Sequence, residues 1–501
     1  MNSFIKVIAI LSAVLMFQSS LIVGLAQSGP LTFEELLRTL RDSQLGPSTA
    51  SRIAQKKVEE RGLKDEIDDE QMAQLRDAGA DDQLVETIAL SLCDKFTTLA
   101  EECDEADENC KIAYLDKALL YHPSDKGVYI DRASSYYRSK NYEFALNDLN
   151  RVLEMDPKHT RALFNRALVY DGQGEYQNAI NDLTLAIEID PKDSSAYFNR
   201  AMAYQSLGDL DSAIKDFSKY IELDPKQPDG YDRRGQAYLE KDLDKKALED
   251  FERALKIDPK YADALVGRGR VNLFRKRFQQ AIKEFDAALK IDEKSTYALH
   301  NRALAYEQLK DLPRAIADLS RVIEIDPDDI DALLDRSRLF EEREEWAAAL
   351  SDYTRLIRLN SKRADLRLFR ARIHLKSSDY ERAIFDYTKA IELDPELTDA
   401  YFERGGIFID LEDFRAALKD YDRFIELEPK DSNAFHNRAL IYFNLGDLQR
   451  AVADATEAIR LNKEHINAYL IRAEAYEGLG EEDKATSDRK TVENLRKKLD
   501  K

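Results

Sequence analysis

One short motif recurs in this 501-residue chain at a fixed spacing. Phe164–Ala167 and Phe198–Ala201 both read FNRA, while His300–Ala303 and His436–Ala439 both read HNRA. The successive intervals are 34, 102 and 136 residues, which are all multiples of 34. A fixed period of this length predicts an array of small supersecondary units, each stacked on its neighbours.

The period extends over most of the chain. Written in rows of 34 residues that begin at Lys126, the sequence gives eleven rows without an insertion. Column 20 is alanine in every row, column 8 is always alanine, glycine or serine, and seven rows carry proline in column 32. Columns 4, 8 and 11, and then 20, 24 and 27, follow the helical period, with a break such as Leu207–Leu210 between them. Each row therefore predicts two antiparallel helices that bury their apolar faces by stacking on neighbouring rows.

These columns resemble the tetratricopeptide repeat, which has small residues, aromatic residues and a proline at the same positions. The resemblance covers eleven repeats over residues 126–499 and implies an all-α, right-handed superhelical solenoid. Its first helices would line a concave groove that binds peptides or partner proteins. Residues 92–125 fit as a degenerate, capping repeat, because Lys111–Pro123 follows the second-helix pattern whereas the first half lacks the expected tyrosine.

The sequence before the repeats has a different character. Lys6 precedes an almost wholly apolar run that ends in small residues at Gly24 and Ala26, which predicts a secretory signal peptide over residues 1–26. The chain would then be exported, to the periplasm or secreted, whereas an uncleaved segment would anchor it to the membrane. Residues 31–91 have no 34-residue register and resemble a small helical module found ahead of other domains in exported bacterial proteins.

Three cysteines, Cys93, Cys103 and Cys110, lie in one short segment. In an oxidising compartment neighbouring cysteines tend to form a disulfide, so the sequence favours a Cys103–Cys110 bond with Cys93 unpaired. The alternative is that all three remain free thiols. No Cys-x-x-Cys is present and the six histidines form no metal-ligand spacing, so we expect no metal ion and no other cofactor.

Column 7 is arginine and column 23 is acidic in all eleven rows, although the general family pattern has leucine in column 7. Because the two helices are antiparallel, the two columns should lie near the same seam. A buried guanidinium without a counter-ion costs several kcal/mol, so we expect an arginine–carboxylate pair within each hairpin or between neighbouring hairpins. The alternative is a positively charged ladder that faces an acidic ligand.

Columns 5 and 6 carry the candidate partner-binding residues. Column 6 lies about 160° from column 8 around a helix, so it should face away from the core. Exposed rings beside amides could hold an extended peptide; alternatively, column 5 packs on the adjacent helix and the amides are only solvated. The candidates are Phe164, Asn165, Phe198, Asn199, His300, Asn301, Phe402, His436 and Asn437. No row has lysine in column 5, so the family's lysine and asparagine clamp for a C-terminal carboxylate is not predicted.

The overall charge excludes some classes of partner. A net charge of −21 repels phosphate backbones and anionic lipids, so nucleic acid is not an expected partner. Charges of both signs are interspersed, as on solvated helix faces, and no nucleophile–base set or phosphate loop points to an enzyme. We therefore expect an exported scaffold that binds a peptide or partner protein in its groove. The alternative is a periplasmic chaperone or assembly factor that holds client proteins.

Overall fold

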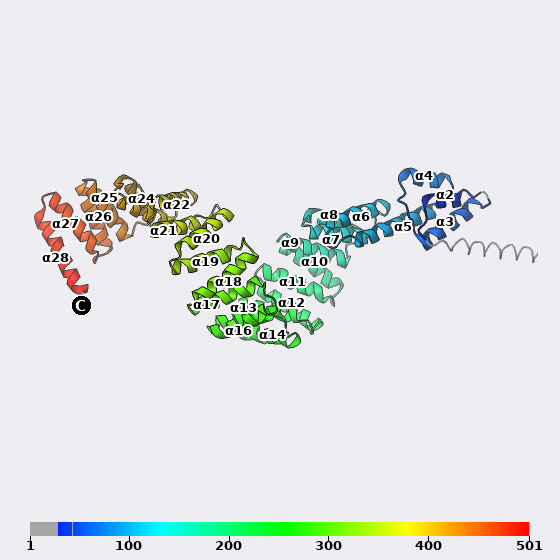
Figure 1. Ribbon diagram of the computed structural model, residues 1–501, viewed down its shortest axis with the longest axis horizontal. Helices are drawn as coiled ribbons and strands as arrows, with labels where there is room; N and C mark the ends of the chain where they lie inside the picture. The colour runs from blue at the N-terminus through cyan, green and yellow to red at the C-terminus, as the bar shows by residue number, and fades with distance from the viewer. Residues whose placement is uncertain (1–28, 43, 500–501) are drawn as a thin grey trace, which may run out of the picture. The chain divides into compact units, whose positions relative to one another are not determined.

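The computed structural model describes residues 29–42 and 44–499, which form 27 α-helices and no β-strand. The chain divides into two compact units between Ile257 and Asp258. From α5 onward, consecutive helices within each unit pair as hairpins, and each hairpin packs on the next (Figure 1). The expected all-α repeat architecture is confirmed, whereas the signal peptide expected over residues 1–26 lies outside the described residues.

The first unit holds the N-terminal module, the leading repeat and repeats 1 to 4. Its helices are α2 (Phe33–Leu40), α3 (Pro47–Arg61), α4 (Asp69–Asp77), α5 (Asp82–Glu101), α6 (Glu108–Tyr121), α7 (Lys126–Arg138), α8 (Tyr142–Met155), α9 (Thr160–Gly172), α10 (Tyr176–Ile189), α11 (Ser194–Ser206), α12 (Leu210–Leu223), α13 (Pro228–Glu240) and α14 (Asp244–Ile257).

The second unit holds repeats 5 to 11. Its helices are α15 (Ala262–Phe274), α16 (Phe278–Leu289), α17 (Thr296–Gln308), α18 (Leu312–Ile325), α19 (Ile330–Glu342), α20 (Trp346–Leu359), α21 (Ala364–Lys376), α22 (Tyr380–Leu393), α23 (Thr398–Asp410), α24 (Phe414–Leu427), α25 (Ser432–Asn444), α26 (Leu448–Leu461), α27 (Ile466–Gly478) and α28 (Glu482–Leu499).

The close approach of the two helices in each repeat depends on the small residue of column 8. In repeat 5, a Cβ atom added at Gly269 would lie 2.5 Å from the ring of Phe285 in column 24. In repeat 9, a Cβ atom at Gly405 would lie 2.9 Å from the ring of Tyr421. The alanines of column 20 are buried throughout, from Ala145 to Ala485. The small columns therefore let a bulky column-24 ring fill the space between the helices.

The turn inside each repeat has the same backbone conformation in all eleven rows. The residue of column 15 has a positive φ of 56° to 81°, whether or not it is glycine. Four rows have glycine, and the other seven have lysine, aspartate, glutamate or serine. Because a left-handed conformation costs a non-glycine residue roughly 1 kcal/mol, hairpin packing imposes this turn on residues that do not favour it. The seven are Lys140, Asp242, Lys276, Lys310, Glu344, Ser378 and Glu412.

The N-terminal module and the leading repeat share one helix. α5 runs without a break through residues 91 and 92, the expected boundary between the two, so one continuous helix joins them. The buried residues Leu84, Ile88, Leu92 and Phe96 keep the helical spacing across this point, with no glycine or proline to end the helix. The first half of α5 packs on α3, and its second half pairs with α6.

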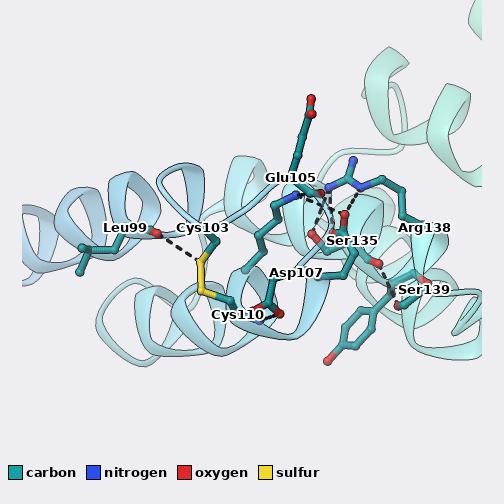
Figure 2. A network of polar contacts seen from close by, with 11 residues as sticks. Leu99, Cys103, Glu105, Asp107, Cys110, Ser135, Arg138 and Ser139 are labelled. Carbon is teal, nitrogen blue, oxygen red and sulfur yellow. Dashed lines mark hydrogen bonds and ion pairs between the residues drawn. A yellow bond between two sulfur atoms is a disulfide. The ribbon is translucent and has the colours of Figure 1, made fainter.

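A disulfide closes the leading repeat. Cys103 and Cys110 are bonded across the turn between α5 and α6, while Cys93 is a free, buried thiol. This confirms the favoured pairing. Figure 2 shows the disulfide beside the contacts by which Arg138 of α7 reaches the start of α6. Arg138 donates Nε and Nη2 to the Glu108 carboxylate at 2.6 and 3.1 Å, which ties the leading repeat to repeat 1.

Candidate functional site

Every column-7 arginine binds the acid of column 23 in its own repeat. Ten arginines donate Nε and Nη2 to the two oxygens of an aspartate at 2.6–3.0 Å, and such bidentate bonds are the strongest of the charged pairs. Arg268 faces Glu284 and makes one bond of 2.6 Å through Nη2. The ion-pair prediction is confirmed, and these arginines do not form a free cationic ladder.

Ten of these arginines also reach the preceding repeat. Each donates Nη1 to the polar side chain of column 25, sixteen residues earlier; Arg200, for example, donates to Thr184 Oγ1 at 3.1 Å. This role is not evident from the sequence, because a polar residue on a second helix looks like a solvated one. The acceptors are Asp116, Asn150, Thr184, Ser218, Asp286, Ser320, Thr354, Thr388, Asp422 and Thr456.

The ten aspartates of column 23 are buried beneath their arginines. Asp216 is 4% exposed and Asp420 is also 4% exposed. Burial raises the pKa of Asp420, and the hydrogen bonds and charge of Arg404 oppose that rise. A buried carboxylate of this kind stays ionised only while its arginine is present. The column-7 arginines therefore hold the fold together through these ion pairs.

The rings of column 5 pack against the second helix of the same repeat, so the expectation that they lie exposed is wrong. Phe198 lies 5.7 Å from Phe217 and 5.0 Å from Tyr220, measured between ring centroids. Phe402 makes the equivalent contacts in repeat 9, and Phe164 packs on the core cluster of repeat 2. Column 5 lies only about 60° from column 8 around the helix, so it belongs to the edge of the apolar stripe.

The two histidines of column 5 are also half-buried and engaged. His300 Nε2 lies 2.9 Å from a carboxylate oxygen of Asp335 in the next repeat, and this hydrogen bond raises the pKa of His300. The ring of His436 lies 5.0 Å from that of His465. Burial lowers the pKa of His436 to about 4, and the charge of His465 lowers it further. Neither ring is presented as a free surface group.

The amides of column 6 separate into two classes. Asn301 is buried and donates to the carbonyl of Tyr297, so the prediction that column 6 faces outward is wrong in repeat 6. Asn437 donates to the Tyr421 hydroxyl of the preceding repeat at 2.8 Å. Asn301 therefore bonds within its own helix, whereas Asn437 links repeats 9 and 10.

Asn165 and Asn199 keep more of their hydrogen-bonding capacity. Asn165 donates Nδ2 to Ser134 Oγ at 3.3 Å, and Asn199 donates Nδ2 to the carbonyl of Ser195 in its own helix at 2.8 Å. Neither side-chain oxygen accepts a hydrogen bond from the residues that the structure describes. These two oxygens lie on α9 and α11, the first helices of consecutive repeats, which contact each other. They are the column-6 groups best able to receive a donor from a ligand.

Three potential metal ligands converge in the leading repeat, which the sequence spacing did not reveal. Ligand atoms of Cys93, His122 and Asp125 all lie within 4.8 Å of one another. Burial raises the pKa of Cys93 to about 11, so this group is a protonated thiol near neutral pH. His122 Nδ1 and Asp125 Oδ2 are 3.1 Å apart, and Asp125 also caps α7. The cluster is explained by these internal contacts.

Comparison with known proteins identifies the repeat. Models of the tetratricopeptide repeat match residues 134–197, 194–227, 233–296, 296–329, 334–398, 398–431 and 420–453, which together make more than half of the chain. The chain belongs to the tetratricopeptide repeat family. Repeats of this family serve as scaffolds for protein–protein interactions, so the expected class of partner is a protein. Among the described residues, no helix has the length and apolar character needed to cross a membrane.

Solved structures share the repeat fold at low identity. MamA from Desulfovibrio magneticus RS-1 is 20% identical, with 34% of this chain and 96% of that chain covered and a TM-score of 0.32. A tetratricopeptide repeat protein from Parabacteroides merdae is 22% identical, with 47% and 93% covered and a TM-score of 0.36. No curated protein matches the chain. At these identities the likeness concerns the fold alone.

Proposed function

We propose that this chain is an exported scaffold whose first helices in repeats 2 and 3 bind an extended segment of a partner protein. The observation that carries this proposal is the pair of available amide oxygens, on Asn165 and Asn199, in the same column of consecutive repeats. Each oxygen can accept a backbone N–H from an extended peptide. The half-buried rings of Phe164 and Phe198 lie next to them in the sequence and offer apolar contact to its side chains.

Export has two supports. The first 26 residues have the basic start, apolar run and small residues of a secretory signal. The Cys103–Cys110 disulfide belongs to a compartment in which thiols are oxidised. The partner would therefore be a periplasmic or secreted protein, or the exposed part of a membrane protein.

Two pairs of substitutions test the binding face. Asn165→Ala with Asn199→Ala removes both acceptors, while Asn147→Ala with Asn181→Ala removes matched amides from the second helices α8 and α10. The mature chain is immobilised, its partner is recovered from an envelope extract and identified, and the affinity of each variant is then titrated. We expect the first pair to weaken binding about tenfold and the second pair to leave it unchanged.

The same experiment separates a scaffold from a chaperone. A scaffold recovers one partner in stoichiometric amount and does not bind an unfolded test protein such as reduced, carboxymethylated α-lactalbumin. Recovery of many unrelated proteins together with tight binding of that test protein would show a client-holding chaperone and overturn the scaffold. If the two double variants bind the partner with equal affinity, the binding site does not lie on the first helices of repeats 2 and 3.

A further inference from the structure

The first helix of repeat 8, residues 364–397, departs from the usual apolar pattern of the repeats in two columns. Column 4 is tyrosine, phenylalanine or leucine in the others but is Arg367 here. Column 11 is tyrosine or phenylalanine in nine repeats, but it is His374 in repeat 8. Both side chains lie on α21, one turn on either side of the column-7 residue Arg370. Repeat 8 has therefore exchanged two apolar groups for two nitrogen-bearing groups at one seam.

The exchange changes the charge around one buried carboxylate. Asp386 is 1% exposed and receives the usual pair of bonds from Arg370, both at 2.7 Å. Arg367 Nη1 lies 3.7 Å from the same carboxylate, and His374 Nε2 lies 3.9 Å away. Arg367 Nε is buried and has no hydrogen-bond partner. Two guanidinium groups thus share one carboxylate, which leaves a positive charge that no acid of the repeat neutralises.

The smaller histidine also leaves a hollow. A cavity of about 550 Å³ opens between α20, α21 and α22, and it continues into a second one of about 420 Å³ that shares Ser351 and Arg358. The first lies between the second helix of repeat 7 and both helices of repeat 8, and the second lies among residues of repeat 7 and the turn before it. We call the first of these the arginine hollow. Its charged and aromatic lining is Arg358, Arg370, His374, Arg382, Phe385 and Asp386.

The sequence around the arginine hollow is basic, whereas the chain as a whole is acidic. The segment Tyr353–Lys376 has eight arginines and lysines and one acid, Asp365, in a protein whose net charge is −21. Charges of both signs are therefore not interspersed in this segment, contrary to the expectation for the chain as a whole. Arg358 is exposed and makes no ion pair or hydrogen bond with the described residues, and Arg382 pairs only with Asp379 of its own turn. Their charges are available to a ligand.

An exposed ring lies beside these charges. Phe385 is 56% exposed, whereas column 22 of the other repeats holds alanine, serine or a polar residue. An apolar ring at the rim of a cationic hollow matches an acidic segment that also carries an apolar side chain. A small inorganic anion would use the charges but not the ring. The hollow lies in repeats 7 and 8, so it shares no residue with the first-helix face of repeats 2 and 3.

We propose that the arginine hollow binds an acidic segment of a partner protein, with carboxylates against Arg358 and Arg382 and an apolar side chain against Phe385. Charge complementarity between this local patch and an acidic segment supplies attraction that the acidic remainder of the chain would oppose. The patch therefore also fixes where along the array such a segment docks.

The test uses the full mature chain and a fluorescein-labelled peptide, Glu-Glu-Leu-Glu-Glu-Leu-Glu-Glu, followed by fluorescence anisotropy. Arg358→Glu reverses the charge of a residue that makes no ion pair or hydrogen bond with the described residues, so the variant should fold. Arg460→Glu makes the same change in column 29 of repeat 10. We expect Arg358→Glu to weaken binding at least about tenfold and Arg460→Glu to change it less than about twofold. Phe385→Ala should weaken binding, whereas Phe144→Ala, at an equally exposed ring, should not.

Three outcomes would overturn the proposal. The wild-type chain could fail to bind the glutamate peptide, or bind a glutamine version equally well. Arg358→Glu and Arg460→Glu could weaken binding equally, which would indicate general electrostatics. Tripolyphosphate could bind to the wild-type chain but not to Arg358→Glu, while the glutamate peptide binds to neither. The hollow would then be a site for a small anion. Failure of the asparagine experiment on repeats 2 and 3 would leave this site unaffected.

Discussion

In the eleven regular repeats an arginine and an acid join the two helices of each hairpin, whereas the leading repeat has Thr98 and Tyr114 in those two columns. The leading repeat instead closes its turn with the Cys103–Cys110 disulfide. It still supplies Asp116 as the column-25 acceptor for Arg132 of repeat 1. The two helices of a hairpin can thus be joined either by the ion pair or by a disulfide. The hydrogen bond from the column-25 residue to the next repeat is present in both cases.

The largest expected effect comes from removing one arginine of a regular repeat. Arg200→Ala leaves the Asp216 carboxylate buried without a counter-ion, so we expect the free energy of unfolding to fall by about 3–5 kcal/mol in urea titrations. The double variant Arg200→Met with Asp216→Leu removes both charges and should lose far less. A single variant that costs under about 1 kcal/mol would show that the pair is not what joins the hairpin.

The second expected effect concerns the leading repeat. Cys103→Ser removes the disulfide between two cysteines that are seven residues apart. Because the unfolded chain is then less constrained, the free energy of unfolding should fall by about 2 kcal/mol. The measurement is urea unfolding of the oxidised protein, with Cys93→Ser as the control that leaves the disulfide intact. If adding a reductant destabilises Cys103→Ser as much as the wild type, the disulfide is not the source of the difference.

The third prediction is a pH dependence confined to the leading repeat. Burial would raise the pKa of Glu108, but hydrogen bonds from Arg138, Ser135 and Lys111 outweigh it and hold the pKa at about 2. Because the folded pKa lies below the unfolded value of about 4.3, the stabilisation is present above that value and is lost as the pH falls toward 2.

Glu108→Gln provides the measurement. It should cost about 1 kcal/mol at pH 7, since Arg138 is half-exposed and water screens the pair. The difference in melting temperature between wild type and variant should shrink steadily from pH 5 to about pH 2.5. A difference that stays constant over this range would mean that the carboxylate charge is not responsible.

The smallest expected effect tests the link between repeats. Thr184→Val removes the acceptor of Arg200 Nη1, and a single partly buried bond of this kind contributes about 0.5–1 kcal/mol. In an Arg200→Met background the same substitution should cost nothing, because the donor is already absent. An equal cost in both backgrounds would assign the loss to packing of the threonine methyl group.

Much of this fold could be predicted from the sequence because its rules are periodic. The column-7 and column-23 residues were paired correctly, since a buried charge requires a counter-ion wherever it occurs. The column-5 rings were placed wrongly, because one helix considered alone does not show the bulky column-24 and column-27 residues of its partner helix. Phe198, for example, is enclosed by Phe217 and Tyr220.

Other features needed the structure for different reasons. Thr184 looks like a solvated residue until the guanidinium of the next repeat is seen beside it. Arg367 and His374 carry no motif, and they stand out only when repeat 8 is compared with the other ten column by column. Their meeting at Asp386 depends on distances between α21 and α22 that no helical period supplies.

Ten of the column-7 arginines have two partners, and this arrangement has a genetic consequence. One partner is an acid sixteen residues later, and the other is a polar side chain sixteen residues earlier. Unequal recombination that adds or removes 34 residues within a unit therefore returns every arginine to partners of the same kind. A gain or loss of any other length would leave a buried carboxylate without its arginine, which would lower the free energy of unfolding by several kcal/mol. The number of repeats can thus change in a single event, while the length of a repeat cannot drift.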